Sequence, residues 1–194
     1  MFPRLPIESA QPLAVFAFAR LLVVAAGVIA LAVLGLPYEG RAFAVLGGLG
    51  VPWSLVCVAL ASLVITPFAS RIAGRFGTAS VIAASSVASA VLISVVWLIE
   101  SMPLLFAVVF LYGVAIALCF TLSEYWINAA TPNRRRGFAM GLYATLLSIG
   151  YAIGPGIIAV LGASSARPYL FGAMLMAASA IPAVAARRLS PDFS

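Results

Sequence analysis

Arg20 is the charged residue of this sequence whose position is hardest to explain without a chemical role. It lies nine residues into an apolar run over residues 11–36, which is about 14 Å along a helix. If this run crosses a bilayer, a charge at that depth costs at least ~2.5 kcal/mol and almost always faces a bundle interior or a wet cavity. The position favours contact with an anionic substrate group or with a proton-carrying carboxylate. The alternative is an arginine that snorkels to the headgroups or is capped by backbone carbonyls.

Glu124 is the second charged residue with a candidate role, because it directly follows an apolar segment that ends near residue 123. An ion pair with Arg71 or Arg75 is one hypothesis. A pair with Arg20 is another, although the two residues differ in depth by several ångströms. The third alternative is a carboxylate that stays solvated at the membrane interface.

Two hydroxyl side chains on a later apolar segment, Tyr143 and Ser148, are candidate substrate contacts. Small hydroxyl residues are also ordinary helix-packing material in membranes, so packing is the alternative role. The sequence has no His, and Cys57 and Cys119 do not form a C-x-x-C pair. We therefore expect no enzyme, no metal site and no cofactor, because a nucleophile with its base is not available.

The composition predicts an all-α polytopic membrane protein. Hydrophobic residues make up 64% of the chain and charged residues 8%, whereas a soluble domain has about 25% charged residues. Six apolar segments reach the ~20 residues that cross a hydrocarbon core, the last of them only just. We expect a six-helix bundle over residues 11–186, with flanking segments at 1–10 and 187–194. The predicted spans are 11–36, 43–67, 79–99, 102–123, 137–162 and 169–186.

The arginines predict the orientation of the bundle. All eleven basic residues are Arg, and ten of them lie outside the predicted spans. Eight of the ten fall on one side of the membrane and two on the other, so we expect both termini in the cytoplasm and the chain in the inner (plasma) membrane. We do not expect a nucleic-acid partner, because the arginines are spread over four membrane-flanking sites rather than gathered on one face. The eight are Arg4, Arg71, Arg75, Arg134, Arg135, Arg136, Arg187 and Arg188, and the two are Arg41 and Arg167.

The predicted fifth span contains a regular set of small residues. Gly141, Gly150, Gly154 and Pro155 form the pattern G-x8-G-x3-G-P. Gly150 and Gly154 make a small-xxx-small face, which lets another helix backbone come close. Pro155 removes one backbone donor and favours a bend in the helix.

This pattern resembles the fifth-helix motif of the major facilitator superfamily, although Ile158 and Ala159 stand where that motif has two more glycines. Residues 67–80 resemble the signature that the family carries between helices two and three, with Gly74 in place of its aspartate. In the family that aspartate belongs to a cytoplasmic charge latch. The resemblance therefore suggests Glu124 as the replacement partner of Arg71 and Arg75.

A third stretch, residues 123–137, is similar to the S/E-x-W-x-N segment and P-x-x-x-R-G turn of bacterial branches of the family. The three matches occur in the family's order between residues 67 and 160. They imply half of a facilitator fold, the N-terminal six-helix half, built as a 3+3 inverted repeat. In the family, helices one and four line the cavity, helices two and five contact the other half, and helices three and six face outward.

Two functions are compatible with these residues. The first is a half-size transporter of a small solute, acting as a homodimer or with a second six-helix half. The second is a transport-inactive scaffold or accessory subunit of a larger membrane complex. Arg20 and the helix-five glycines favour the transporter, whereas the degenerate latch and the missing second half favour the scaffold. With either function, we expect the chain to be embedded in the lipid bilayer.

The arginine distribution yields a topology test. Reporter fusions after Ser194 should be active only with a cytoplasmic reporter, and insertions within 163–168 only with a periplasmic one. A periplasmic C-terminus would contradict the orientation assigned to every segment above.

Overall fold

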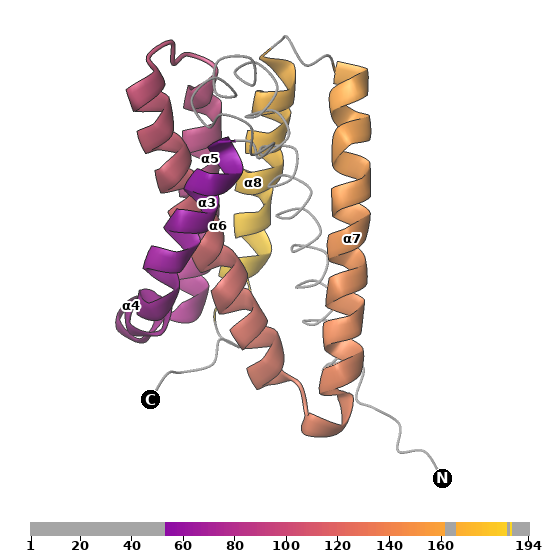
Figure 1. Ribbon diagram of the computed structural model, residues 1–194. Helices are drawn as coiled ribbons and strands as arrows, with labels where there is room; N and C mark the ends of the chain where they lie inside the picture. Colours follow the sequence, from indigo (N-terminus) through magenta and orange to yellow (C-terminus); the bar gives the residue numbers. More distant parts are fainter. Residues whose placement is uncertain (1–52, 162–165, 186, 188–194) are drawn as a thin grey trace.

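The computed structural model of the chain describes residues 53–161, 166–185 and 187 (Figure 1). These residues contain five helical segments that are long and apolar enough to cross a membrane. The predicted first span, 11–36, lies outside the described residues together with Arg20. The described part is all-helical, as expected, and its candidate spans are Val56–Phe76, Thr78–Val96, Met102–Ala130, Asn133–Leu161 and Arg167–Ala185.

The second span remains helical for longer than the sequence predicts. Helix α3 (Trp53–Ile65) passes through a short 3-10 turn, η2 (Thr66–Phe68), into α4 (Ala69–Phe76). We expected this span to end at residue 67, but the chain turns only at Gly77, whose φ is +82°. An L side chain rarely adopts this φ, so glycine is what permits α5 (Thr78–Val96) to start at the next residue.

Helix α6 (Met102–Ala130) also extends beyond its predicted end at residue 123. Glu124 and Asn128, the polar residues of this extension, do not stop the helix. Thr131 ends the helix in an extended conformation, which the following Pro132 favours by disfavouring α-helical torsions in the residue before it.

The last two helices follow the predicted spans closely. A 3-10 turn, η3 (Asn133–Arg135), leads into α7 (Arg136–Leu161), and α8 (Arg167–Ala185) ends the described helical part. Helix α7 is continuous through Pro155, so the proline does not break it (Figure 1). Helix α8 likewise continues past Pro182.

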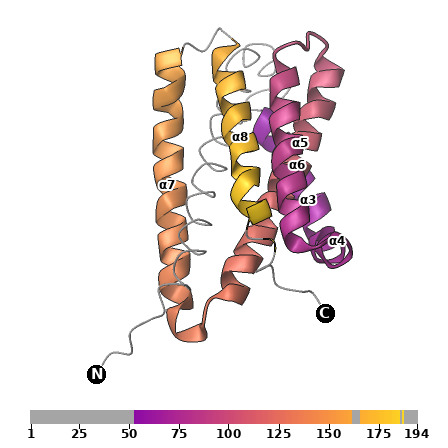
Figure 2. The same ribbon diagram turned by 180° about the vertical axis from the view of Figure 1, so that it is seen from behind.

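The core lies where α5 meets α8 and α6. Helix α5 makes its most extensive contacts with α8 and then with α6, and α6 packs on its other side against α3. Helix α7 has far fewer contacts with the other described helices, and both views place it along one side of the bundle (Figures 1 and 2). The largest fully buried side chains are Tyr112, Tyr169, Ile93, Leu105, Leu122, Met176 and Val96.

Gly113 lets α6 approach α3 at backbone distance. A Cβ atom built on Gly113 would lie 2.8 Å from Cβ of Ala61 and 2.9 Å from Cα of Val58. Such distances leave no space for a methyl group unless one helix moves. With Ala117, Gly113 forms a small-xxx-small pair, a packing signal that is present in the sequence but was not among the predicted motifs.

Gly113→Ala should therefore destabilise the protein by about 1–3 kcal/mol, because overpacking forces the two helices apart. Thermal unfolding of the purified protein in detergent would measure the effect. Gly137→Ala is the matched control, since nothing lies within 4 Å of its added Cβ. Equal unfolding temperatures for both variants would show that α3 and α6 do not depend on this contact.

Candidate functional site

Glu124 on α6 and Tyr143 on α7 form a polar contact between two helices. The Tyr143 hydroxyl donates a hydrogen bond to Oε1 of Glu124 over 3.2 Å. Tyr143 is buried, with 6% of its surface exposed, while Glu124 is partly buried. The carboxylate is thus held at the edge of the bundle by a phenol rather than left free in solvent.

The register of the α6–α7 turn brings the two residues to the same depth. Glu124 precedes the end of α6 by six residues, and Tyr143 follows the start of α7 by seven, so both stand about 10 Å from the turn. Asn128 donates from its amide nitrogen to the backbone oxygen of Glu124 over 2.9 Å, one turn further along α6. The pairing thus follows from the similar distances of Glu124 and Tyr143 from the α6–α7 turn.

Arg71 and Arg75 lie apart from this contact. Both are exposed on α4. The guanidinium carbon of Arg71 lies 5.9 Å from the centre of the Phe68 ring, and that of Arg75 lies 5.5 Å from the Phe76 ring. Over the part of the chain that the structure describes, no ion pair joins either arginine to Glu124. The latch formed by these three residues stays a prediction.

The predicted glycine motif is divided between two faces of α7. Gly150 and Gly154 are buried, on the same face as Tyr143. Gly141 is exposed, and a Cβ atom there would meet nothing within 4 Å. Nine residues correspond to two and a half helical turns, so Gly141 and Gly150 must lie on opposite sides. The close contact expected of Gly150 and Gly154 stays a prediction, and so does the role of Pro155.

The exposed side of α7 carries a stripe of small residues that was not predicted from the sequence. Ser148, a predicted substrate contact, belongs to this stripe and not to the buried face of Tyr143. Its hydroxyl donates to the backbone oxygen of Ala144 over 2.9 Å. The α7 stripe consists of Gly141, Thr145, Ser148, Ala152 and Gly156, which follow helical spacing and are all exposed or partly exposed.

Other chemistry-bearing groups are sparse in the described ranges. Within residues 53–161, 166–185 and 187, no three of His, Cys, Asp and Glu lie close enough together to hold a metal ion. Cys57 and Cys119 do not form a disulfide with each other. The Cys119 sulfur lies 3.6 Å from the Ser86 hydroxyl oxygen, a buried contact between α6 and α5. This pair contributes to packing and has no base beside it in the described part.

Comparison with known proteins places the chain in a family. The model of the Major Facilitator Superfamily matches residues 16–193. The chain therefore belongs to the major facilitator superfamily, and it is a multi-pass membrane protein of a transporter family. This assignment points to transport rather than to catalysis.

A solved structure has a similar fold. It is the crystal structure of a mutant of the peptide transporter POT in complex with sulfate, with a TM-score of 0.65 and 16% sequence identity. The match covers 92% of this chain and 38% of that chain, so the present chain spans less than half of the transporter's length. A search of curated proteins finds no match.

The contact between Glu124 and Tyr143 can be tested by a double-mutant cycle. Tyr143→Phe should cost about 1–2 kcal/mol, because it removes a hydrogen bond to a partly exposed charged group. The cost should be smaller when Glu124 is already Ala, which is the non-additivity expected of residues in contact. Unfolding of the purified protein would measure both, with Ser148→Ala as the control for loss of a hydroxyl on the same helix. Additive effects of the Tyr143 and Glu124 substitutions would contradict the contact.

Proposed function

We propose that this chain acts as one six-helix half of a facilitator transporter for a small solute, and that a second half packs against α7. The second half is another copy of this chain or a separately encoded one. The observation that carries the proposal is the α7 stripe. In the candidate span Asn133–Leu161, which joins η3 and α7, 13% of the most apolar stretch is buried. This is the lowest share among the candidate spans of the described residues.

The stripe fits a helix partner better than lipid alone. Added Cβ atoms at Gly141 and Gly156 would meet nothing within 4 Å, so two of its positions expose bare backbone. Thr145 and Ser148 donate to carbonyls of their own helix, so neither hydroxyl needs a further acceptor on this face. Small residues with satisfied hydroxyls allow two helices to approach closely in a membrane, where packing rather than the hydrophobic effect holds helices together.

The family assignment and the chain's 38% coverage of the POT structure agree with half a transporter. We propose that the solute pathway lies on the side of α7 that carries Tyr143, whose hydroxyl Glu124 holds, and that Arg20 contacts the solute. The matching structure is of a peptide transporter, but identity of 16% carries the fold and not the substrate. The proposal therefore extends to a small solute and to no particular chemical class.

One observation favours the scaffold as a second candidate function. Gly74 replaces the aspartate of the family's latch, and no ion pair in the described ranges replaces it. A transporter without a latch loses one of the contacts that stabilise one of its two conformations. A transport-inactive subunit has no such requirement, and it would use the α7 stripe to join a larger complex. Uptake of solutes into vesicles that contain the purified protein would favour the transporter.

Two leucine substitutions on α7 test the assembly. Gly141→Leu should leave the six-helix half folded and abolish pairing, because its side chain would stand between two helix backbones. Gly150→Leu should instead reduce folding and accumulation, since this glycine is buried within the chain. Ser148→Cys crosslinking in native membranes and co-purification of two differently tagged copies would report pairing, and thermal unfolding would report folding.

The outcomes separate the partners. Crosslinks between copies that disappear with Gly141→Leu would identify a homodimer, and the same loss for a separately encoded half would identify a heterodimer. If Gly141→Leu assembles like the original chain with every candidate partner, the α7 stripe faces lipid and the proposal fails.

A further inference from the structure

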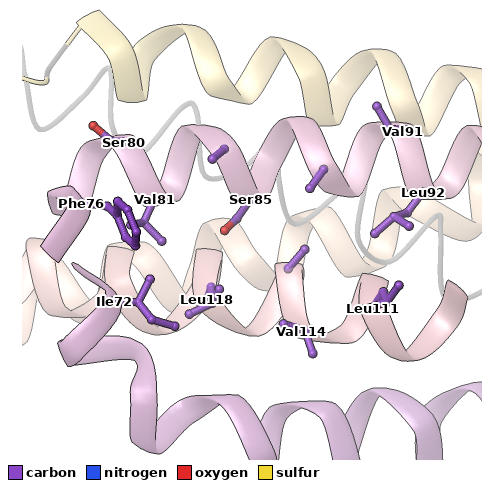
Figure 3. Close-up of a pocket in the computed structure, with 13 residues that line it drawn as sticks. Ile72, Phe76, Ser80, Val81, Ser85, Val91, Leu92, Leu111, Val114 and Leu118 are labelled. Atoms are coloured by element: carbon purple, nitrogen blue, oxygen red, sulfur yellow. The ribbon is translucent and has the colours of Figure 1, made fainter. Parts of the chain in front are cut away.

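Residues of α4, α5 and α6 line an apolar groove of about 820 Å³ (Figure 3). Small side chains on α5, including Ala84 and Ala88, leave the hollow, and larger ones on α6, including Leu111 and Leu118, border it. Among the residues that the structure describes, no charged side chain lines the groove. It lies on helices that are long and apolar enough to cross a membrane, so an occupant from the bilayer is compatible with its surroundings.

One end of the groove lies beside positive charge. Ile72 and Phe76 of α4 form this end, and Figure 3 shows them near Ser80 and away from Leu111. The guanidinium carbon of Arg75 stands 5.5 Å from the centre of the Phe76 ring. Arg71 lies one turn earlier on α4 and is also exposed. A cation therefore stands at the groove's entrance while the interior is uncharged.

The length of the groove matches a single leaflet. Along α5 it extends from Ser80 to Leu92, which is twelve residues or about 18 Å. Half of a ~30 Å hydrocarbon core is ~15 Å. An acyl chain with its headgroup at α4 would fill this length, whereas a transmembrane helix that crosses both leaflets would extend about 12 Å beyond the groove.

The charge at the entrance has no counter-ion from the described helices. Among the described residues, Glu100 and Glu124 carry the carboxylates. Glu100 follows the far end of α5, and Glu124 accepts the hydrogen bond of Tyr143. No ion pair in this part of the chain involves Arg71 or Arg75. An anion at the entrance would therefore meet guanidinium groups that no carboxylate of the described helices occupies.

We propose that this groove binds a phospholipid with an anionic headgroup from the cytoplasmic leaflet. One acyl chain lies along Ala84 and Ala88, and the phosphate stands at Arg75 and Arg71. A basic residue near the membrane surface contributes about a fivefold preference for an anionic lipid. The apolar groove holds the chain of any phospholipid, and the arginines provide the selectivity for charge.

Photolabelling of the full chain tests this site. The protein would be reconstituted into phosphatidylcholine vesicles that contain a minor fraction of phosphatidylglycerol with a diazirine on its acyl chain. Mass spectrometry should find the label within residues 84–92 and 111–118. Arg75→Gln should reduce this labelling about fivefold, and Arg75→Lys should retain most of it because the charge remains.

Two further variants keep the result interpretable. Arg134→Gln removes an exposed arginine at the α6–α7 turn, so it should leave labelling in the groove unchanged. Ala88→Phe should fill the hollow and remove the label from 84–92 without altering binding elsewhere, and thermal unfolding would establish that it folds. Because Arg75 is exposed, its variants should fold like the original chain.

Three outcomes would overturn the proposal. Equal labelling by diazirine phosphatidylcholine would show that the site does not select charge. Equal losses in Arg75→Gln and Arg134→Gln would show that only the overall surface charge matters. Diazirine crosslinks from the groove to a second protein chain, in place of lipid, would show that a protein occupies it.

Discussion

A bilayer offers the backbone no hydrogen-bonding partner, and this constraint is reflected in how most hydroxyl side chains of the described bundle are used. Several hydroxyl groups, among them those of Ser86, Ser123, Thr131 and Ser148, donate to the carbonyl oxygen four residues earlier. A hydroxyl satisfied by its own helix leaves nothing unpaired when that helix is inserted. It also does little to choose a neighbouring helix, so helix pairing depends on side-chain size and on a small number of polar contacts between helices.

Close packing of small residues and polar contacts between side chains contribute differently to the individual helix pairs. Helices α3 and α6 pack through the close approach at Gly113, and α5 and α6 add the contact of Ser86 with Cys119. Helix α7 has sparse packing with the described helices, and there the hydrogen bond from Tyr143 to Glu124 joins it to α6. A polar contact contributes most where apolar packing is thin. The hydrogen bond between Tyr143 and Glu124 lies near the α6–α7 turn, so other contacts must position the part of α7 that is far from the turn.

Much of the fold followed from the sequence, because length and hydropathy are what a membrane demands of a helix. Five predicted spans have counterparts in the structure, and the errors are at the ends. Helix α6 runs to Ala130 because no glycine or proline interrupts residues 124–130, and hydropathy alone does not mark where a helix ends. The site was harder to predict. An arginine partner for Glu124 stays a prediction. The contact that the structure shows, with Tyr143, depends on the register of two helices after a turn. The predicted latch depends on how far the arginines of α4 lie from Glu124 on α6. The spacing of residues in the sequence does not determine this distance.

The α7 stripe and the apolar groove of α4, α5 and α6 differ in chemistry and lie on different sides of the bundle. Both views place α7 at one edge, with α4 and α5 toward the other (Figures 1 and 2). The stripe exposes backbone and small side chains without charge, which suits a flat helix face. The groove spans one leaflet and has arginines at one end, which suits a chain with a charged head. A phospholipid in the groove would therefore not compete with a second half on α7. The phospholipid would instead contact α4, α5 and α6 together and so would stabilise their packing. Helix α7 is joined to α6, so the same lipid would support the helices on which α7 rests when it pairs with a second half.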